Sequence, residues 1–321
     1  MSAGRASLVP IAVLAIMAVV PSSALAETRI GILLWNSQPR YEQCKEGVLE
    51  VLRREGFKEG EATVVVEQAY GNHNTAAQLA RKFAESHLAI VVPIGTSAAL
   101  AAAEAMKDTP VVFAMVFDPV AVKIAQDWKT SGNNTTGSSS KAPASALLGA
   151  LRRLTAVKKL AVLYTPGEAN SEAQLTDFED LQKEYAITTI AVPLRSRVEV
   201  EAALNKVAAA PAEAVVLTGS SVIGDTVAQI VLLASRVHIV TATQSEDHVD
   251  KGVLLGVTVD PRAVGRLAGE KAVRVLRGAT PASIPIEALK TSQVMVNLKT
   301  AKASGIDVPA DVRKMATRLV E

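Results

Sequence analysis

Aromatic residues, cysteine and net charge are all scarce in this sequence. Its 321 residues include only 2 Trp, 4 Tyr and 5 Phe, so the core must consist mainly of Ala, Val, Leu and Ile. The single cysteine, Cys44, excludes an intramolecular disulfide, and we expect it to be a small buried side chain in a helix. With 34 Lys and Arg against 32 Asp and Glu, the net charge is +2. No run of basic residues is present, which argues against nucleic-acid binding.

The motifs of common cofactor, metal and nucleophile sites are also missing. The chain has no Gly-x-Gly-x-x-Gly or Gly-x4-Gly-Lys-Ser/Thr loop, and no His or Cys residues at the spacing of metal ligands. The segment Gly95–Ala99 is one residue away from the Gly-x-Ser-x-Gly turn of hydrolases, but Ala99 replaces the second Gly. None of the 4 His residues has an acidic partner by spacing. We therefore expect no cofactor, no metal and no enzymatic activity, with an exported hydrolase as the weakest alternative.

The first residues of the chain have the composition of a targeting segment. A basic residue, Arg5, precedes an apolar run over Leu8–Val20, and the small-x-small motif Ala24–Ala26 follows. This pattern predicts a secretory signal peptide over residues 1–26, cleaved before Glu27. The apolar run is shorter than the roughly 20 residues that span a bilayer, and a retained membrane anchor is the alternative. No Cys follows the cleavage point to carry a lipid, so we expect a soluble protein exported to the periplasm.

Short β-branched runs alternate with Ala-rich helical segments through the rest of the chain. This alternation is typical of βαβ units and a parallel sheet. It restarts after the Gly-, Asn-, Ser- and Thr-rich loop 130–140, and so predicts two α/β halves with a weak internal repeat. The predicted strands are 29–35, 63–70, 89–94, 111–117, 159–164, 188–192, 214–218, 238–241, 253–259 and 294–298. The predicted helices are 41–55, 75–86, 97–106, 171–185, 198–209, 223–235 and 261–277.

The part of the chain after residue 253 adds elements that neither half accounts for alone, so we expect the chain to cross back between the halves. Crossings near residues 135–138, 258–260 and 286–289 would form three hinge strands. The predicted N-terminal lobe is 27–137 plus 260–287, and the predicted C-terminal lobe is 138–259 plus 288–321. Two lobes on several hinges indicate a cleft that closes on a ligand.

Residues beyond the carboxyl ends of the predicted strands are the candidate site, because open parallel sheets bind ligands there. They are Trp35, Asn36, Ser37, Gly95, Thr96, Ser97, Asp118, Tyr164, Thr218, Ser220, Gln244 and Glu246. Thr96 and Ser97 stand between a strand and a helix, where hydroxyl and helical N–H groups can hold an anion; a simple N-cap is the alternative. Glu246 or Asp118 could accept an ammonium group, or else cap a helix or lie in solvent.

Two of the few aromatic residues, Trp35 and Tyr164, occupy matching positions in the two halves. Each stands at the end of the first strand of its half. We predict that they press a flat or apolar ligand from both sides when the cleft closes. The alternative is that both side chains seal the top of a core.

Three segments of the chain have a distinctive form. They are Asp118-Pro119-Val120, the loop Ser131–Gly137, and a tail in which Val296–Ala301 is followed by Gly305–Pro309. These segments resemble the ABC transporter substrate-binding protein family that includes tryptophan- and tyrosine-type binding proteins. The resemblance covers essentially the whole chain from Arg29 onward.

The resemblance implies an α/β type I periplasmic binding fold, with two Rossmann-like lobes on parallel sheets joined by about three hinge crossings. It further implies no catalysis, and delivery of a small polar or amphipathic solute, such as an amino acid, to an ABC permease and its ATPase in the inner membrane. We expect the protein to act as a monomer. A periplasmic sensor that signals to a partner protein is the alternative, because its lobes would look the same.

Overall fold

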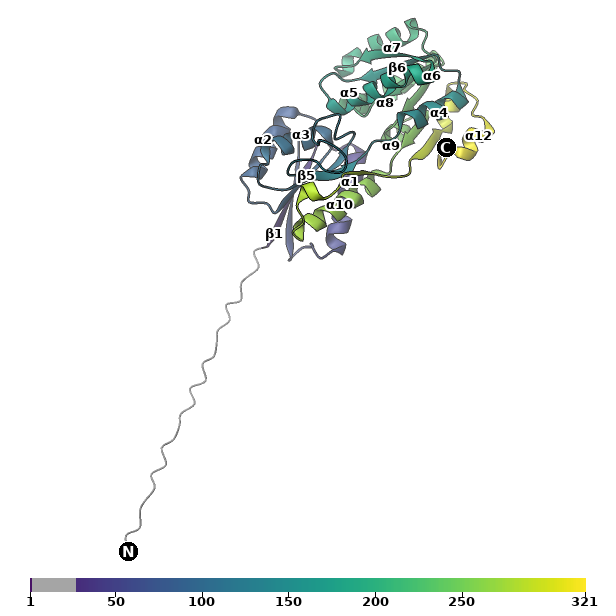
Figure 1. Ribbon diagram of the computed structural model, residues 1–321. Helices are drawn as coiled ribbons and strands as arrows, with labels where there is room; N and C mark the ends of the chain where they lie inside the picture. Colours follow the sequence, from purple (N-terminus) through teal and green to yellow (C-terminus); the bar gives the residue numbers. More distant parts are fainter. Residues whose placement is uncertain (2–26) are drawn as a thin grey trace.

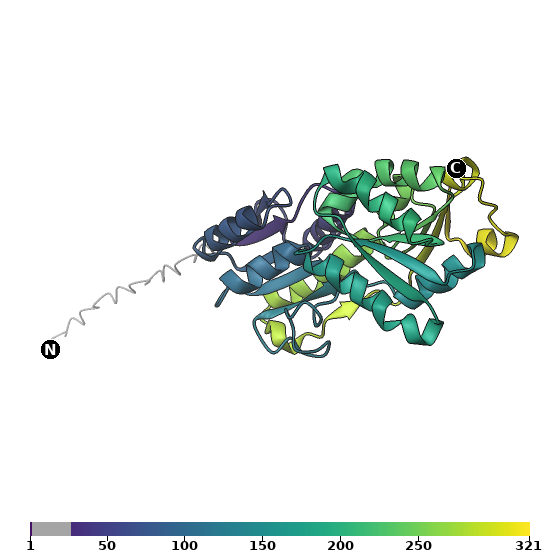
Figure 2. The same cartoon turned by 90° about the horizontal axis from the view of Figure 1, so that it is seen from above.

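Two α/β lobes lying side by side make up the molecule (Figure 1 and Figure 2). The structure is a computed structural model that describes Met1 and residues 27–321. The predicted signal peptide, apart from Met1, lies outside the described residues. Among the helices of residues 27–321, none is both long enough and apolar enough to span a membrane.

The N-terminal lobe contains a six-stranded sheet in the order β11-β5-β4-β3-β1-β2, with parallel pairing throughout. The strands are β1 (Thr28–Leu34), β2 (Ala62–Gln68), β3 (Ile90–Ile94), β4 (Val111–Val116), β5 (Thr135–Ser139) and β11 (Glu287–Ala288). The helices are α1 (Pro39–Arg54), α2 (His73–Ala84), α3 (Thr96–Ala105) and α10 (Pro261–Leu276), with a short 3-10 helix η2 (Pro281–Ser283). β3 and β4 are fully buried apolar runs, as strands covered by helices on both faces require.

The C-terminal lobe contains a seven-stranded sheet in the order β13-β12-β10-β9-β8-β6-β7. The strands are β6 (Lys159–Tyr164), β7 (Thr188–Pro193), β8 (Ala214–Leu217), β9 (Val240–Thr243), β10 (Leu255–Thr258), β12 (Gln293–Asn297) and β13 (Arg318–Val320). The helices are α4 (Ala144–Leu154), α5 (Ala169–Asp180), α6 (Gln182–Tyr185), α7 (Val200–Ala209), α8 (Ser221–Arg236), α9 (Glu246–Asp250), α11 (Leu298–Ala303) and α12 (Ala310–Met315), with the 3-10 helix η1 (Arg197–Glu199). Only the β10–β12 pair is antiparallel among the described strands.

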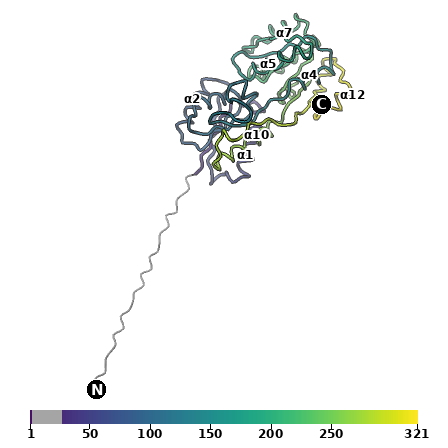
Figure 3. Tube along the Cα trace, in the orientation of Figure 1, coloured from purple at the N-terminus to yellow at the C-terminus, as the bar shows by residue number. Residues whose placement is uncertain are grey.

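The chain passes between the two sheets at three places: between β5 and α4, between β10 and α10, and between β11 and β12. The second crossing returns α10 to the N-terminal lobe, where it packs beside α1 although the two helices are far apart in sequence (Figure 3). The α/β class, with two lobes built on mostly parallel sheets, is confirmed.

The segment predicted as the loop 130–140 contains a buried strand, β5. Its sequence, Thr-Thr-Gly-Ser-Ser, has no apolar residue, yet all five residues are buried between β4 and β11. Two of its hydroxyl groups have backbone partners: Thr136 donates to the Ile284 carbonyl at 2.8 Å, and Ser138 donates to the Val264 carbonyl at 2.9 Å, while the Thr135 hydroxyl has no protein partner within residues 27–321. Buried polar side chains are tolerated when they are hydrogen-bonded in this way, which a hydrophobicity pattern does not reveal.

Glycine residues allow α1 and α10 to approach each other closely. A Cβ atom on Gly265 would overlap the carbonyl oxygen of Cys44, and one on Gly47 would overlap the carbonyl oxygen of Arg262. Cys44 itself is fully buried in the core of the N-terminal lobe, as expected, and burial raises the pKa of its thiol. The interface between these helices therefore joins two distant parts of the chain at backbone-to-backbone distance.

We expect Gly265→Ala to lower the free energy of unfolding by about 1–3 kcal/mol, the usual cost of overpacking a core. The added carbon would force α1 and α10 apart. Gly149→Ala is the matched control, because Gly149 lies inside α4 with open space around it, and Ala there should stabilise the helix slightly. Urea unfolding followed by circular dichroism measures both variants. A Gly265→Ala protein as stable as wild type would contradict the close packing.

Candidate functional site

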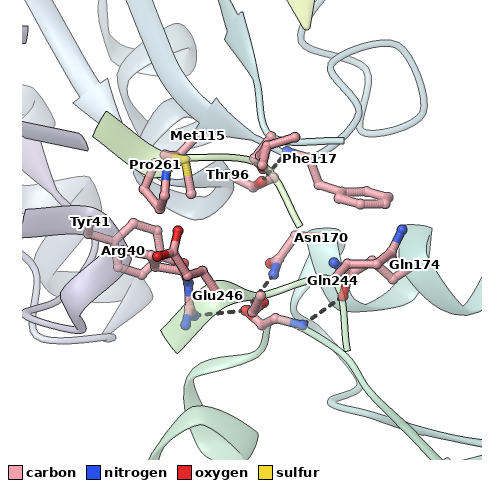
Figure 4. A pocket seen from close by; sticks show the side chains of 14 residues that line it. Arg40, Tyr41, Thr96, Met115, Phe117, Asn170, Gln174, Gln244, Glu246 and Pro261 are labelled. Carbon is pink, nitrogen blue, oxygen red and sulfur yellow. Dashed lines mark hydrogen bonds between the residues drawn. The ribbon is translucent and has the colours of Figure 1, made fainter. Parts of the chain in front are cut away.

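A cavity lies between the lobes, above the carboxyl ends of central strands of both sheets. About 470 Å³ of space not filled by protein atoms, part of it open to solvent, lies between the residues of its wall. Its wall consists of Arg40, Tyr41, Thr96, Met115, Phe117, Ser140, Asn170, Gln174, Gly219, Gln244, Ser245, Glu246, Val259 and Pro261. Figure 4 shows how these side chains converge from both lobes. Open α/β sheets bind ligands at this end of their strands.

The N-terminal lobe supplies the apolar part of the wall. Tyr41 stands in the first turn of α1, Phe117 follows β4 directly, and Pro261 begins α10. Met115 has a φ of 57°, and it lies where the register between β4 and β5 shifts. A bulge of this kind redirects the side chains next to it, here toward the cavity. The outcome is an aromatic and aliphatic surface on the N-terminal side of the cleft (Figure 4).

The C-terminal lobe supplies an amide-rich wall opposite. The side chain of Asn170 donates to the Gly219 carbonyl at 3.0 Å, and the Gly219 N–H donates to Oε1 of Gln174 at 2.6 Å. Nε2 of Gln244 donates to the Ala142 carbonyl at 2.5 Å. Each side-chain amide thus uses either its NH₂ group or its oxygen to hold a loop that follows a strand. Within residues 27–321 the other end of each has no protein hydrogen bond, so it can serve a molecule in the cavity.

Thr96 opens α3 at the cavity wall. Its Oγ1 accepts a hydrogen bond from the Phe117 N–H at 3.2 Å. The N-cap residue, Gly95, has a φ of 101°, and no side chain caps this helix. A Cβ at Gly95 would press against Trp35 and Tyr41, so glycine is required there. The first N–H groups of α3 lack intrahelical partners and, with the Thr96 hydroxyl, suit a carboxylate or another anion.

Arg40 and Asp247 form a buried ion pair that joins the lobes. Nη1 of Arg40, on α1, lies 3.1 Å and 2.9 Å from the two carboxylate oxygens of Asp247, on α9. Nη2 donates to the Gly219 carbonyl at 3.1 Å, and the guanidinium carbon lies 4.6 Å from the centre of the Tyr41 ring. Burial alone would raise the pKa of Asp247, but Arg40 and other nearby positive charges bring it below its usual value. Burial lowers the pKa of the neighbouring His248 to about 3, so its ring is neutral. The charge of Arg40 is therefore balanced inside the protein.

Glu246 is the carboxylate in the wall of the cavity. It begins α9 and is partly buried, and its Oε1 accepts a hydrogen bond from Nη1 of Arg318 at 3.0 Å. Burial raises its pKa, Arg318 opposes this shift, and Asp250, Asp260 and Asp247 add to it, so that the pKa is above its usual value. Among residues 27–321, no three His, Cys, Asp or Glu side chains are grouped as metal ligands. The wall therefore contains one carboxyl group, which Arg318 contacts through one of its two oxygens.

Three of the residues predicted from strand ends line the cavity: Thr96, Gln244 and Glu246. Gly95 and Ser97 flank Thr96 without lining the cavity themselves. Each of the three lining residues follows a strand in the middle of its sheet, β3 or β9. The strand-end rule therefore selects the end of both sheets at which this cavity lies, but it also includes strands too far from the centre of the sheet to reach the cavity.

The predicted aromatic pair, Trp35 and Tyr164, does not flank this cavity. Trp35 is 2% exposed, and its Nε1 donates to Oγ of Ser221 at 2.7 Å, across the two lobes. Tyr164 packs against the core of the C-terminal lobe. The physical reason is sheet order, because β1 and β6 stand next to the edge strands β2 and β7 while the cavity lies over the centre. The aromatic side chains that line the cavity are Tyr41 and Phe117.

Thr218 and Ser220 belong to a buried network at the start of α8. Oγ1 of Thr218 lies 2.6 Å from Oγ of Ser171, and Oγ of Ser220 lies 2.7 Å from Oγ1 of Thr165. Ser220 also caps α8 by accepting the Ile223 N–H at 3.0 Å. Both predicted residues therefore hold the loop after β8 in place and do not line the cavity.

Asn36, Ser37 and Asp118 also lie outside the cavity wall. Asn36 and Ser37 line a separate surface hollow, and Nδ2 of Asn36 donates to Oγ of Ser221 at 3.2 Å. Asp118 forms an ion pair with Lys141 at 2.8 Å, and it caps the turn that follows. Of the two acids predicted to accept a cation, only Glu246 therefore faces the cavity.

The strand-end rule misses several wall residues because they stand on helices. Arg40 and Tyr41 occupy the first turn of α1, and Asn170 and Gln174 occupy α5. Asn170 and Gln174 are four residues apart, so they share one face of their helix. Two amides at that spacing, on the helix after the first strand of a lobe, are the signal by which they could have been found.

The match to a known family extends over nearly the whole described chain. Residues 29–320 match the sequence profile of a family described as ABC transporter substrate binding protein. The chain belongs to this family. The matched residues include both lobes, the three crossings and every residue of the cavity wall. A substrate-binding protein of an ABC transporter takes a small-molecule ligand and works with the permease of the transporter, and the cavity between the lobes suits such a ligand.

Similar proteins are described as binding tyrosine, tryptophan or leucine. A tyrosine-binding protein from Clostridioides difficile (strain R20291) is 25% identical over 279 residues, which cover 86% of this chain and 81% of the relative. The crystal structure of an ABC domain from Streptococcus pneumoniae in complex with L-Trp has a TM-score of 0.86 and 27% identity, and covers 92% of this chain and 100% of that chain. A leucine-binding protein from Thermotoga maritima has a TM-score of 0.61 and 15% identity, and covers 77% of this chain and 83% of that chain. These likenesses confirm the type I periplasmic binding fold of this substrate-binding protein.

Proposed function

We propose that this substrate-binding protein captures an amino acid with an aromatic or large apolar side chain and delivers it to an ABC importer. The observation that carries the proposal is the division of the cavity wall. An aromatic and aliphatic half comes from the N-terminal lobe, and an amide-rich half with the acid Glu246 comes from the C-terminal lobe. An amino acid has the complementary parts, an apolar side chain and a zwitterionic head. The tyrosine-binding relative and the L-Trp complex support an aromatic side chain.

In this proposal each part of the solute has its own protein partner. The ammonium group binds the carboxylate of Glu246, and the carboxylate binds the Thr96 hydroxyl and the first N–H groups of α3. The side chain packs against the rings of Tyr41 and Phe117. Arg40 is not assigned to the solute carboxylate, because its charge is already balanced inside the protein.

Binding is coupled to closure of the lobes in the same proposal. The moving units are the two lobes, and the N-terminal lobe includes all of β5 and β11, so it extends past the predicted boundaries at residues 137 and 287. The Arg40–Asp247 ion pair and the hydrogen bond from Trp35 to Ser221 both join one lobe to the other, so they belong to the closed form. A solute between the lobes would favour that form by contacting both walls at once.

The cellular setting completes the proposal. The signal-peptide pattern of residues 1–26 supports export to the periplasm, and the lack of a Cys after the cleavage point argues for a form without a lipid anchor. The partners are the permease and the ATPase of an ABC importer in the inner membrane. The protein acts as a monomer, without a cofactor, a metal or a catalytic step.

Isothermal titration calorimetry of the exported protein with L-Trp, L-Tyr, L-Phe and L-Leu tests the proposed ligand class. We expect saturable binding of the aromatic amino acids, and stabilisation by about 2.7 kcal/mol at a ligand concentration of 100 Kd. Tryptamine lacks the carboxylate and indole-3-propionate lacks the ammonium group, so both should bind much more weakly than L-Trp. Failure of every amino acid to bind would contradict the proposal.

Phe117→Ala should weaken L-Trp binding by at least about tenfold, because it removes an aromatic side chain from the wall. Tyr164→Ala is the matched control, since Tyr164 is also at the end of a strand but packs against the core of the C-terminal lobe. That variant should lower thermal stability and leave the Kd for L-Trp within about twofold. Titration calorimetry of both variants decides the matter. A loss of affinity in Tyr164→Ala with none in Phe117→Ala would support the sequence-predicted aromatic pair instead.

A further inference from the structure

The C-terminal end of the chain reaches the wall of the cavity. β13 pairs in parallel with β12, with Arg318 opposite Met295, at the edge of the C-terminal sheet. From there the Arg318 side chain extends to α9, where Nη1 donates to Oε1 of Glu246 at 3.0 Å and Nη2 forms an ion pair with Asp250. A residue near the end of the chain thus touches the carboxylate that faces the cavity.

Acidic groups surround Glu246, and Arg318 is the cation that contacts it. Asp247 and Asp250 share its helix, and Asp260 precedes α10. Within residues 27–321, three other basic groups lie close to this cluster without contacting Glu246: Arg40 and Lys251, at 2.9 Å and 4.0 Å from Asp247, and Arg266, at 3.9 Å from Asp260. Without Arg318, partial burial and like charges would both disfavour the ionised form of Glu246.

We propose that Arg318 is a positioning residue for solute binding: it fixes one oxygen of the Glu246 carboxylate, keeps the group ionised, and leaves the other oxygen for the ammonium group of the solute. This inference rests on the proposed function, because it assigns the solute ammonium to Glu246. In this role β13 supports the binding site in addition to forming an edge strand of the sheet. Arg318 itself does not line the cavity.

The contacts distinguish this role from a purely structural one. The backbone of β13 pairs with β12 at three positions, so the strand has its own attachment that a change of the Arg318 side chain leaves in place. The Arg318 side chain is 42% exposed and packs little, whereas the Glu246 side chain is only 15% exposed. Removing the guanidinium should therefore alter the protonation of Glu246 and have little effect on the stability of the lobe.

The test compares wild type, Arg318→Ala and Arg318→Lys by titration calorimetry with L-Trp between pH 5 and pH 8. We expect Arg318→Ala to weaken binding about fivefold at neutral pH, since a partly exposed ion pair contributes modestly. As the pH falls, its affinity should begin to drop at a higher pH than that of wild type. Arg318→Lys should restore part of the affinity at neutral pH and shift the onset of the drop back toward the wild-type pH. Arg153→Ala is the matched control, because Arg153 forms an exposed ion pair with Asp311 at 2.9 Å away from the cavity.

A second measurement needs no solute. Carboxyl-detected NMR titration of Glu246 should give a higher pKa in Arg318→Ala than in wild type, with thermal stability nearly unchanged. An unchanged Glu246 titration and an unchanged pH profile would overturn the inference, as would a uniform loss of affinity at all pH values with a large fall in Tm. If wild type bound no amino acid, the proposed function would fail, while the NMR titration would still decide whether Arg318 controls Glu246.

Discussion

Asp247→Asn should weaken amino-acid binding by about two orders of magnitude. The variant keeps the shape of the side chain but leaves the Arg40 guanidinium without its counter-charge whenever the lobes are closed. Both side chains are about 95% buried in the described structure. Removing one partner of a buried ion pair costs about 3–5 kcal/mol, and each factor of ten in affinity is about 1.4 kcal/mol. Because the partners come from different lobes, this free-energy cost disfavours closure of the lobes and leaves the folding of each lobe unchanged.

The partner variant, Arg40→Met, should respond to pH in a way that Asp247→Asn does not. It leaves a buried carboxylate, which can take up a proton and become neutral. Arginine does not lose its proton in proteins, so the Arg40 charge that remains in Asp247→Asn cannot be neutralised by a change of pH. Acidification from pH 7 to pH 5 should therefore recover part of the binding in Arg40→Met and none in Asp247→Asn. Titration calorimetry gives the affinities, and small-angle scattering gives the fraction of closed molecules.

Two controls make the ion-pair prediction strict. The double variant Arg40→Met/Asp247→Leu removes both charges, and it should bind more tightly than either single variant because no charge is left unpaired. Asp311→Asn removes one partner of an exposed pair with Arg153, and it should change affinity by less than about twofold. If the double variant bound no better than Asp247→Asn, the buried pair would not be a determinant of closure.

Glu246→Gln should lower the affinity for L-Trp by about a hundredfold. The substitution keeps the size of the side chain but removes the charge that pairs with the solute ammonium group, and losing one partner of a buried charged hydrogen bond costs about 2–5 kcal/mol. Indole-3-propionate, which has no ammonium group, should bind wild type and the variant about equally. Asp118→Asn is the matched control: Asp118 is the other acid that the sequence suggested, but it lies outside the cavity wall and pairs with Lys141. Competition titrations with both ligands measure these ratios.

The pH dependence of wild-type binding follows from the raised pKa of Glu246. As the pH falls through that pKa, the carboxyl group is protonated and the affinity for an amino acid decreases, while the solute keeps its ammonium charge. Stability responds in the opposite direction, because a carboxyl group with a raised pKa in the folded state contributes most below its ordinary pKa and loses that contribution as the pH rises. Burial also raises the pKa of Glu168, to about 6, so this residue contributes to the pH dependence of stability as well. Comparing wild type with Glu168→Gln separates the contribution of Glu168 from that of Glu246. An affinity in Glu246→Gln that fell with pH as steeply as in wild type would contradict the assignment.

Local patterns in the sequence predicted most of the scaffold. Strand β6 begins and ends at the predicted residues, and β3, β4 and β8 differ from prediction by one residue at one end. These strands are continuous apolar runs covered on both faces, and such runs are visible without knowledge of their neighbours. β5 lies in the predicted loop 130–140, where a hinge strand at 135–138 was expected but not a strand buried in the sheet, because the segment has no apolar pattern. Its Thr136 and Ser138 hydroxyl groups donate instead to the distant carbonyls of Ile284 and Val264. Short edge strands such as β11 and β13 have too few residues to produce a pattern.

The sequence by itself determined the α/β class, and it placed Thr96, Gln244 and Glu246 at strand ends, where the structure has them in the cavity wall. Each of these follows from periodicity and from the order of strand and loop, which are local. Only the tertiary structure decided which strand ends share the cavity, since this depends on strand order and on how the lobes face each other. Trp35 therefore contacts Ser221, and Arg40 reaches Asp247 across 207 positions of the chain. Long-range pairs of this kind arise from packing, and no spacing in the sequence encodes them.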